Sequence, residues 1–102
     1  MTTDDDSKVR IACIQMQPMV GELATNLAHS LDLIKQAVAQ GAKLVVLPEL
    51  ASSGYVFKSR EEAFAASETI PGGPALTAWS EIAARHGLHL VAGICERDGT
   101  KL

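Results

Sequence analysis

One carboxylate in this sequence stands where α/β proteins commonly place their chemistry. Glu49 directly follows a short, unbroken apolar run, residues 44–48 (LVVLP), which predicts a buried strand. Ligands of open α/β sheets bind beyond the carboxyl ends of the parallel strands, and Pro48 restrains the backbone just before this carboxylate. A carboxylate held beside an apolar wall can accept a proton, as a general base must. Glu49 is therefore a candidate general base, and the alternative is a glutamate that is solvated at a strand end.

Two further features near Glu49 each have a functional and a structural interpretation. Tyr55 could border a substrate pocket beside the carboxylate, or it could pack and hydrogen-bond locally within its loop. Residues 71–74 (PGGP) precede an expected helix, whose free N–H groups would attract an anion. Their spacing is not that of a phosphate-binding loop, so a turn is the favoured interpretation.

The cysteines and histidines are not predicted to form a catalytic or metal site. Cys13 and Cys95 lie within expected strands, whereas nucleophiles favour exposed strand-to-helix turns, so we expect both to be small core residues. Two cysteines cannot make the disulfide framework of a small secreted fold, which favours a reducing, cytoplasmic setting. His86 and His89 straddle Gly87 and do not share one face as metal ligands would. No cofactor is expected.

The elements around Glu49 follow the order strand, helix, strand. Residues 8–16 predict a first strand with apolar side chains on both faces, which indicates a strand covered on both sides. Residues 22–40 predict an amphipathic helix that ends at Gly41. Its apolar stripe is formed by Leu23, Leu27, Leu31, Ile34 and Val38. With the strand at residues 44–48, these elements predict a β-α-β unit of a parallel sheet.

The next part of the sequence predicts a second helical connection between parallel strands. Residues 60–68 are compatible with a short helix, and another helix begins at Pro74 and ends at Gly87, with Leu76 and Trp79 on its core face. Residues 88–95 predict the third strand. Asp98-Gly99 favours a hairpin turn, but only Lys101 and Leu102 follow it. We therefore expect residues 8–102 to be the N-terminal segment of an α/β domain, truncated within its fourth strand.

Length and composition narrow the class of protein further. The chain has 102 residues, 47% of them apolar and 21% charged, which is typical of a folded domain. Its net charge is −3, and residues 1–7, an expected disordered tail, contain the three aspartates that account for this excess. The near-neutral remainder does not favour a nucleic-acid partner. No apolar stretch approaches the ~20 residues of a membrane span, and the N-terminus does not read as a signal peptide.

The ordered set of motifs resembles the N-terminal portion of the nitrilase superfamily, the carbon–nitrogen hydrolases. The segment that carries most of the resemblance is residues 41–50 (GAKLVVLPEL), which contains Glu49. The other matching positions are residues 12–18 (ACIQMQP), Gly21, Asn26, Gly54, Tyr55, residues 71–74 (PGGP) and residues 93–99 (GICERDG). The resemblance covers nearly everything from Val9 onward.

The resemblance implies a four-layer α-β-β-α sandwich, incomplete in this chain, and a Glu-Lys-Cys catalytic set. The cysteine would attack an amide, carbamoyl or nitrile carbon, the glutamate would act as general base, and the lysine would stabilise the developing negative charge. Glu49 matches the family glutamate. The family lysine and cysteine lie further along than this sequence extends, and Lys101 precedes the expected lysine position. The resemblance also implies a small-molecule substrate, no cofactor, and a homo-oligomer when the protein is full length.

A second hypothesis belongs to a different class of protein. The chain could be a small, non-catalytic α/β module that binds a ligand or another protein. Such a module would have an open sheet with an apolar face and an unpaired edge, both of which favour association. That exposure argues against a self-contained module and in favour of the enzyme fragment.

Overall fold

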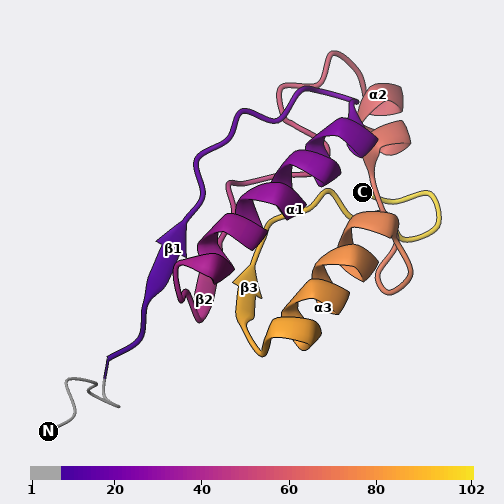
Figure 1. Ribbon diagram of the computed structural model, residues 1–102. Coiled ribbons are helices and arrows are strands. Elements are labelled where there is room, and N and C mark those ends of the chain that lie inside the picture. The colour runs from indigo at the N-terminus through magenta and orange to yellow at the C-terminus, as the bar shows by residue number, and fades with distance from the viewer. Residues whose placement is uncertain (1–7) are drawn as a thin grey trace, which may run out of the picture.

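The computed structural model of the chain describes residues 8–102, so the predicted acidic tail at residues 1–7 lies outside the described residues. Within this range, strands and helices follow one another along the chain in the order that the sequence predicts (Figure 1). They are β1 (Ile11–Cys13), α1 (Leu23–Ala39), β2 (Leu44–Val46), α2 (Arg60–Ala66), α3 (Pro74–His86) and β3 (His89–Val91).

The three strands form one parallel sheet in the order β1-β2-β3. Ala12, Val45 and Leu90 lie side by side in its register. Each strand is shorter than predicted: β1 loses residues at both ends, β2 ends before Leu47, and β3 loses mainly its carboxyl end. The Leu47 N–H still donates to the Val91 carbonyl at 2.9 Å, but Pro48 has no N–H to continue the pairing. The α/β class and the parallel sheet are thus confirmed, with shorter strands.

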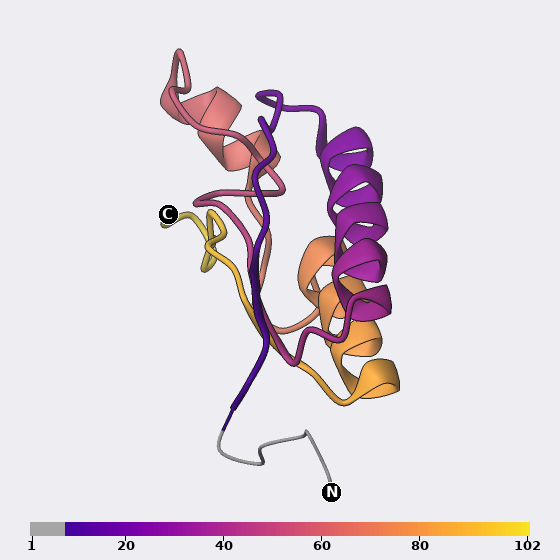
Figure 2. The same ribbon diagram turned by 60° about the vertical axis from the view of Figure 1, so that its left-hand side comes forward.

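Helices α1 and α3 pack on one side of the sheet, and α2 lies beyond the carboxyl ends of the strands (Figure 2). The core between helices and sheet includes Ile34 of α1, Val45 of β2 and Trp79 of α3, all buried. Trp79 also donates from Nε1 to the Ser30 hydroxyl at 2.9 Å, which joins the two helices by a buried hydrogen bond. The predicted apolar faces of both helices are therefore confirmed.

The opposite face of the sheet is open. Ile11 is 55% exposed and Val91 is 53% exposed, and Cys13 is exposed as well. These side chains alternate along the strands with the residues that face α1 and α3, so they point to the side that carries no helix. The prediction that both faces are covered is wrong for the described residues, and so is the prediction that Cys13 is a core residue. Residues 8–102 form two of the four expected layers.

The ends of the helices agree with the sequence except at α2. Gly41 (φ +88°) follows α1, and Gly87 (φ +61°) caps α3. Helix α2, predicted over residues 60–68, ends at Ala66. Asp98 and Lys101 exchange backbone hydrogen bonds of 2.9 and 3.0 Å, so a tight turn is present, but its central pair is Gly99-Thr100, one residue later than the predicted Asp98-Gly99. None of the helices at residues 8–102 is long and apolar enough to cross a membrane.

Candidate active site

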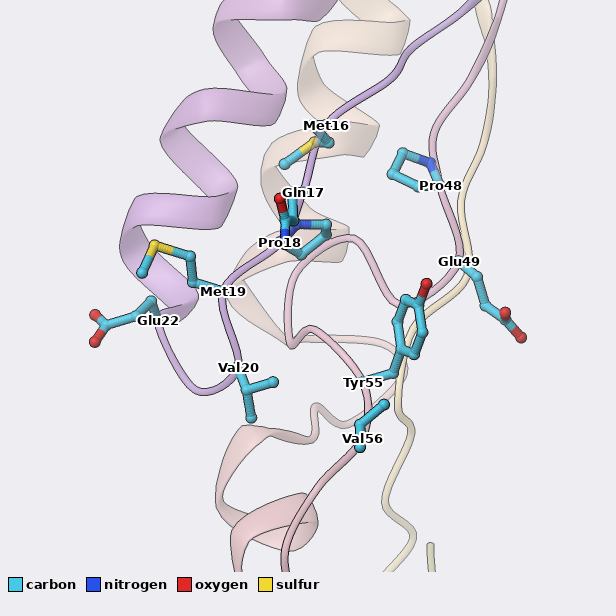
Figure 3. Close-up of a pocket in the computed structure, with 10 residues that line it drawn as sticks. All are labelled: Met16, Gln17, Pro18, Met19, Val20, Glu22, Pro48, Glu49, Tyr55 and Val56. Atoms are coloured by element: carbon cyan, nitrogen blue, oxygen red, sulfur yellow. The ribbon is translucent and has the colours of Figure 1, made fainter.

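A cavity of about 560 Å³ lies between two segments that follow β1 and β2. One wall is formed by residues 16–20 and Glu22, and the other by Pro48, Glu49, Tyr55 and Val56 (Figure 3). The structure thus places the carboxylate and the tyrosine singled out in the sequence on the same cavity, at the carboxyl end of the sheet. This is the position at which open parallel sheets bind ligands.

The backbone at Glu49 is held while its side chain remains exposed. Leu47, just before the proline, is buried in the core, and the Ala51 N–H donates to the Gly93 carbonyl at 3.3 Å. In Figure 3, the Glu49 and Glu22 carboxylates point away from each other on opposite sides of the cavity. A held backbone with an accessible carboxylate is compatible with a general base, and it is equally what a solvated glutamate at a strand end would show.

Tyr55 and Val56 form the exposed tip of the loop that follows Glu49. Tyr55 is 55% exposed, and Figure 3 shows its ring between Val56 and Glu49. The structure therefore leaves about half of this residue accessible, which suits a wall against which a small molecule could pack.

The same loop contains two residues with unfavourable backbone geometry. Leu50 has φ +49° and Val56 has φ +72°, values that residues with a branched side chain rarely adopt. Between them, residues 51–54 are buried. Such conformations persist only where the surrounding structure imposes them, and they cluster at functional sites. The loop that carries Glu49 is therefore constrained by its neighbours.

Comparison with known proteins identifies the family. The sequence profile of the carbon–nitrogen hydrolases matches residues 10–102. The chain belongs to the carbon–nitrogen hydrolase family. Among curated relatives, a nitrilase of Pyrococcus abyssi is 44% identical over 94 residues, which cover 92% of this chain and 36% of that protein. An omega-amidase (NIT2) of Danio rerio is 42% identical over 98 residues, which cover 94% of this chain and 33% of that protein.

A citrullinase of Francisella tularensis is more distant, at 32% identity over 94 residues, which cover 91% of this chain and 32% of that protein. This carbon–nitrogen hydrolase chain thus spans about a third of the length of the curated relatives it matches. The names of these relatives refer to nitrile, amide and citrulline chemistry. The family is shared, whereas the substrate differs from one relative to another.

Neither Cys13 nor Cys95 lines the cavity beside Glu49. Cys13 is on the open face of the sheet, and Cys95 is half-buried beside α2, with its Sγ 3.9 Å from the Ala63 carbonyl oxygen. The structure thus gives neither thiol a position beside Glu49. Within residues 8–102, no three His, Cys, Asp or Glu side chains are grouped so that they could hold a metal ion, and His86 and His89 are both exposed.

Glu68 is a buried carboxylate that sequence reasoning missed. It is 3% exposed, and it accepts hydrogen bonds from the N–H groups of Ala75 at 3.1 Å and Leu76 at 3.3 Å in the first turn of α3. A side chain on Gly73 would overlap Glu68, so this glycine permits the close approach. The N-terminus of α3 does bind an anion, but the anion is a glutamate of the same chain.

Proposed function

We propose that the chain is the N-terminal part of an enzyme that hydrolyses non-peptide carbon–nitrogen bonds, with Glu49 as its general base. The observation that carries this proposal is the accessible Glu49 carboxylate on a cavity at the end of β2, in a chain of the carbon–nitrogen hydrolase family. The substrate would be a small amide, carbamoyl compound or nitrile. The homo-oligomeric state and the cytoplasmic setting belong to the same proposal, and the free thiols of Cys13 and Cys95 fit a reducing compartment.

In this mechanism, a cysteine and a lysine from the rest of the enzyme complete the site. For an amide, the cysteine sulfur attacks the carbonyl carbon while Glu49 takes the thiol proton, and the nitrogen leaves as ammonia or an amine after receiving that proton. Water then attacks the thioester while Glu49 takes a proton from it, and Glu49 returns that proton to the cysteine sulfur as the carbon–sulfur bond breaks, which releases the acid and restores the thiol. The lysine stabilises the negative oxygen in both steps. Residues 1–102 alone would be inactive because a base without its nucleophile cannot form the thioester.

The open face of the sheet supports this proposal over a self-contained binding module. Ile11, Val91 and Cys13 are apolar or weakly polar side chains on a face without a covering layer. In the proposed sandwich, a second sheet from the rest of the enzyme would cover this face. A module of residues 1–102 would leave the same face in water, which favours aggregation.

The coding sequence of the full-length enzyme provides the first test. We expect the reading frame to continue beyond codon 102 with the second arm of the hairpin, a lysine, and then a cysteine at a sharp turn after a strand. Sequencing of the gene or its transcript measures this directly. A stop codon at that point, together with hydrolase activity of the purified chain, would contradict the proposal.

The second test is Glu49→Gln in the full-length enzyme. We expect turnover to fall by about 10² to 10⁴, the usual contribution of a general base, while the melting temperature stays nearly unchanged because the side chain is exposed. Steady-state kinetics on a set of simple amides and nitriles gives the measurement. Glu81→Gln is a matched control, since Glu81 is an exposed carboxylate on α3. Near-normal turnover of Glu49→Gln would refute the assignment.

A further inference from the structure

Asn26 is a buried polar side chain that contacts both walls of the Glu49 cavity. It lies in the first turn of α1 and is 2% exposed. Its Oδ1 accepts a hydrogen bond from the Met19 N–H at 2.9 Å, and its Nδ2 donates to the Met19 carbonyl at 2.8 Å. Its Nδ2 also donates to the Ser52 carbonyl at 2.9 Å. Met19 belongs to one wall of the cavity, and Ser52 lies in the buried loop between Glu49 and Tyr55 of the other.

These contacts need the amide of an asparagine. The Met19 N–H requires an acceptor, and the two carbonyl oxygens require donors, so the orientation of the amide is fixed by its partners. A carboxylate would have no hydrogen to donate to either carbonyl. An alanine would leave the buried Ser52 carbonyl and the Met19 backbone without these partners, which disfavours the present position of both walls.

The two walls also touch directly around this amide. The Gly21 N–H donates to the Ser53 carbonyl at 3.0 Å. Gly54, at φ +74°, approaches so closely that an added Cβ would lie 2.9 Å from the backbone nitrogen of Val20. The backbone at residues 20–21 thus lies directly against the backbone at residues 53–54, with no room for a side chain at Gly54. The hydrogen bonds of Asn26 reinforce this contact.

We propose that Asn26 is a positioning residue of the Glu49 site, which fixes the loop after β2 against the segment after β1. This inference rests on the proposed function, since it takes Glu49 as the base. The Glu49 side chain is exposed, so its location follows from the backbone that carries it. Leu50 follows Glu49 directly, and Val56 lies further along the same loop. Both residues have positive φ, and such conformations persist only where the surrounding structure imposes them. The Asn26 amide supplies such a constraint in the middle of the loop.

The experiment compares two variants of buried polar residues on successive turns of α1, in the full-length enzyme. We expect Asn26→Ala to lower kcat and kcat/KM together by about 100-fold, the size of effect that a displacement of about 1 Å produces at a reacting group. Ser30→Ala is the matched control, because Ser30 is fully buried and its hydroxyl hydrogen-bonds with Trp79 and Leu27 rather than with either wall. Its kcat should stay within about twofold of the wild type at temperatures well below melting.

A purely structural role for Asn26 would give a different pattern. Both variants would then lose thermal stability while each kept a nearly normal kcat in its folded state, and that result would overturn the inference. Should Asn26→Ala fold poorly, Asn26→Asp has the same shape and keeps the acceptor for the Met19 N–H but loses both donations. We expect it to lower kcat by a similar factor, and a wild-type kcat in this variant would equally overturn the inference.

Glu49→Gln separates this inference from the proposed function on which it rests. If Glu49→Gln keeps normal turnover, the assignment of the base has failed, and the inference fails with it. If Glu49→Gln abolishes turnover while both Asn26 variants keep normal kcat, the proposed function stands and the positioning role is refuted. Loss of turnover in Glu49→Gln and in both Asn26 variants, with Ser30→Ala active, supports both.

Discussion

Glu49 and Glu68 are the same residue type in two opposite environments. Glu49 is exposed, next to a cavity at the end of β2. Glu68 is 3% exposed, and its carboxylate accepts hydrogen bonds from two N–H groups at the start of α3. A carboxylate whose oxygens are occupied by backbone donors cannot easily bind another partner, whereas an exposed one can.

The difference lies in what already occupies each carboxylate. The helix N-terminus, which attracts anions, is occupied by Glu68 from within the chain, so it offers no free site for a ligand. Glu68 also joins the segment after β3, since its backbone N–H donates to the Cys95 carbonyl at 2.8 Å and its carbonyl accepts from the Arg97 N–H at 2.9 Å. The carboxylate at α3 thus stabilises the fold, and the carboxylate at β2 remains available for chemistry.

Among the variants that test this comparison, Glu68→Ala is expected to change the free energy of unfolding most. The substitution leaves the Ala75 and Leu76 N–H groups without their acceptor, and we expect a loss of about 3 kcal/mol in the free energy of unfolding. Thermal unfolding of the full-length enzyme should show a midpoint lower by about 5 °C or more. Turnover per folded molecule should stay close to that of the wild type.

Glu49→Ala is the matched control for that measurement. Since its side chain is exposed, we expect its free energy of unfolding to lie within about 0.5 kcal/mol of that of the wild type, with turnover lost. A stable Glu68→Ala enzyme, or an unstable Glu49→Ala enzyme, would show that the two carboxylates do not divide reactivity and stability in this way.

Much of the scaffold was predictable because its signals are local. The stripe of Leu23, Leu27 and Ile34 and the glycine after it predict α1 from neighbouring residues alone. The apolar run before Glu49 predicts β2, and a β-α-β order leaves little choice of topology. These elements also predict the edge of the sheet at which Glu49 lies. They do not predict the chemical role of Glu49.

The faces of the sheet could not be assigned in the same way. Ile11 and Cys13 alternate with Ala12 and Ile14, so both faces of β1 read as apolar, and the sequence predicts cover on both. Which face meets a helix depends on where α1 and α3 pack, and this is a property of distant contacts. The residue type of Cys13 predicts burial. No helix or second sheet among residues 8–102 covers the face of the sheet on which Cys13 lies, so its side chain is exposed.

The roles of Glu68 and Asn26 were hidden for a related reason. Helix α2 ends at Ala66 without a glycine or proline to mark it, so Glu68 reads as a continuation of a helix. Its partners lie in α3, beyond a turn whose geometry the sequence does not specify. Asn26 contacts Ser52, 26 residues further along the chain, and nothing in the spacing predicts that contact. Polar side chains that connect separate loops become visible only in three dimensions.

The smallest effect is expected at Tyr55, the neighbour of Glu49 on the cavity. Its ring is half exposed beside the carboxylate, so it should act as a wall for the substrate rather than as a partner in proton transfer. Tyr55→Phe keeps the ring and should leave kcat and KM within about threefold of the wild type, whereas Tyr55→Ala should raise KM by about tenfold with a smaller change in kcat. Tyr55→Phe should melt as the wild type does because it keeps the ring, and Tyr55→Ala should melt slightly lower because it removes the covered half of the ring.

Steady-state kinetics of the two Tyr55 variants in the full-length enzyme, on a substrate that the wild type hydrolyses, gives this comparison. A large fall in kcat for Tyr55→Phe would mean that the hydroxyl takes part in the reaction, and the chemistry of the loop after β2 would then not be confined to Glu49. Equal KM values for all three enzymes would mean that the ring does not contact the substrate. Either result would change the roles proposed for Glu49 as the base and for Tyr55 as a wall of the cavity.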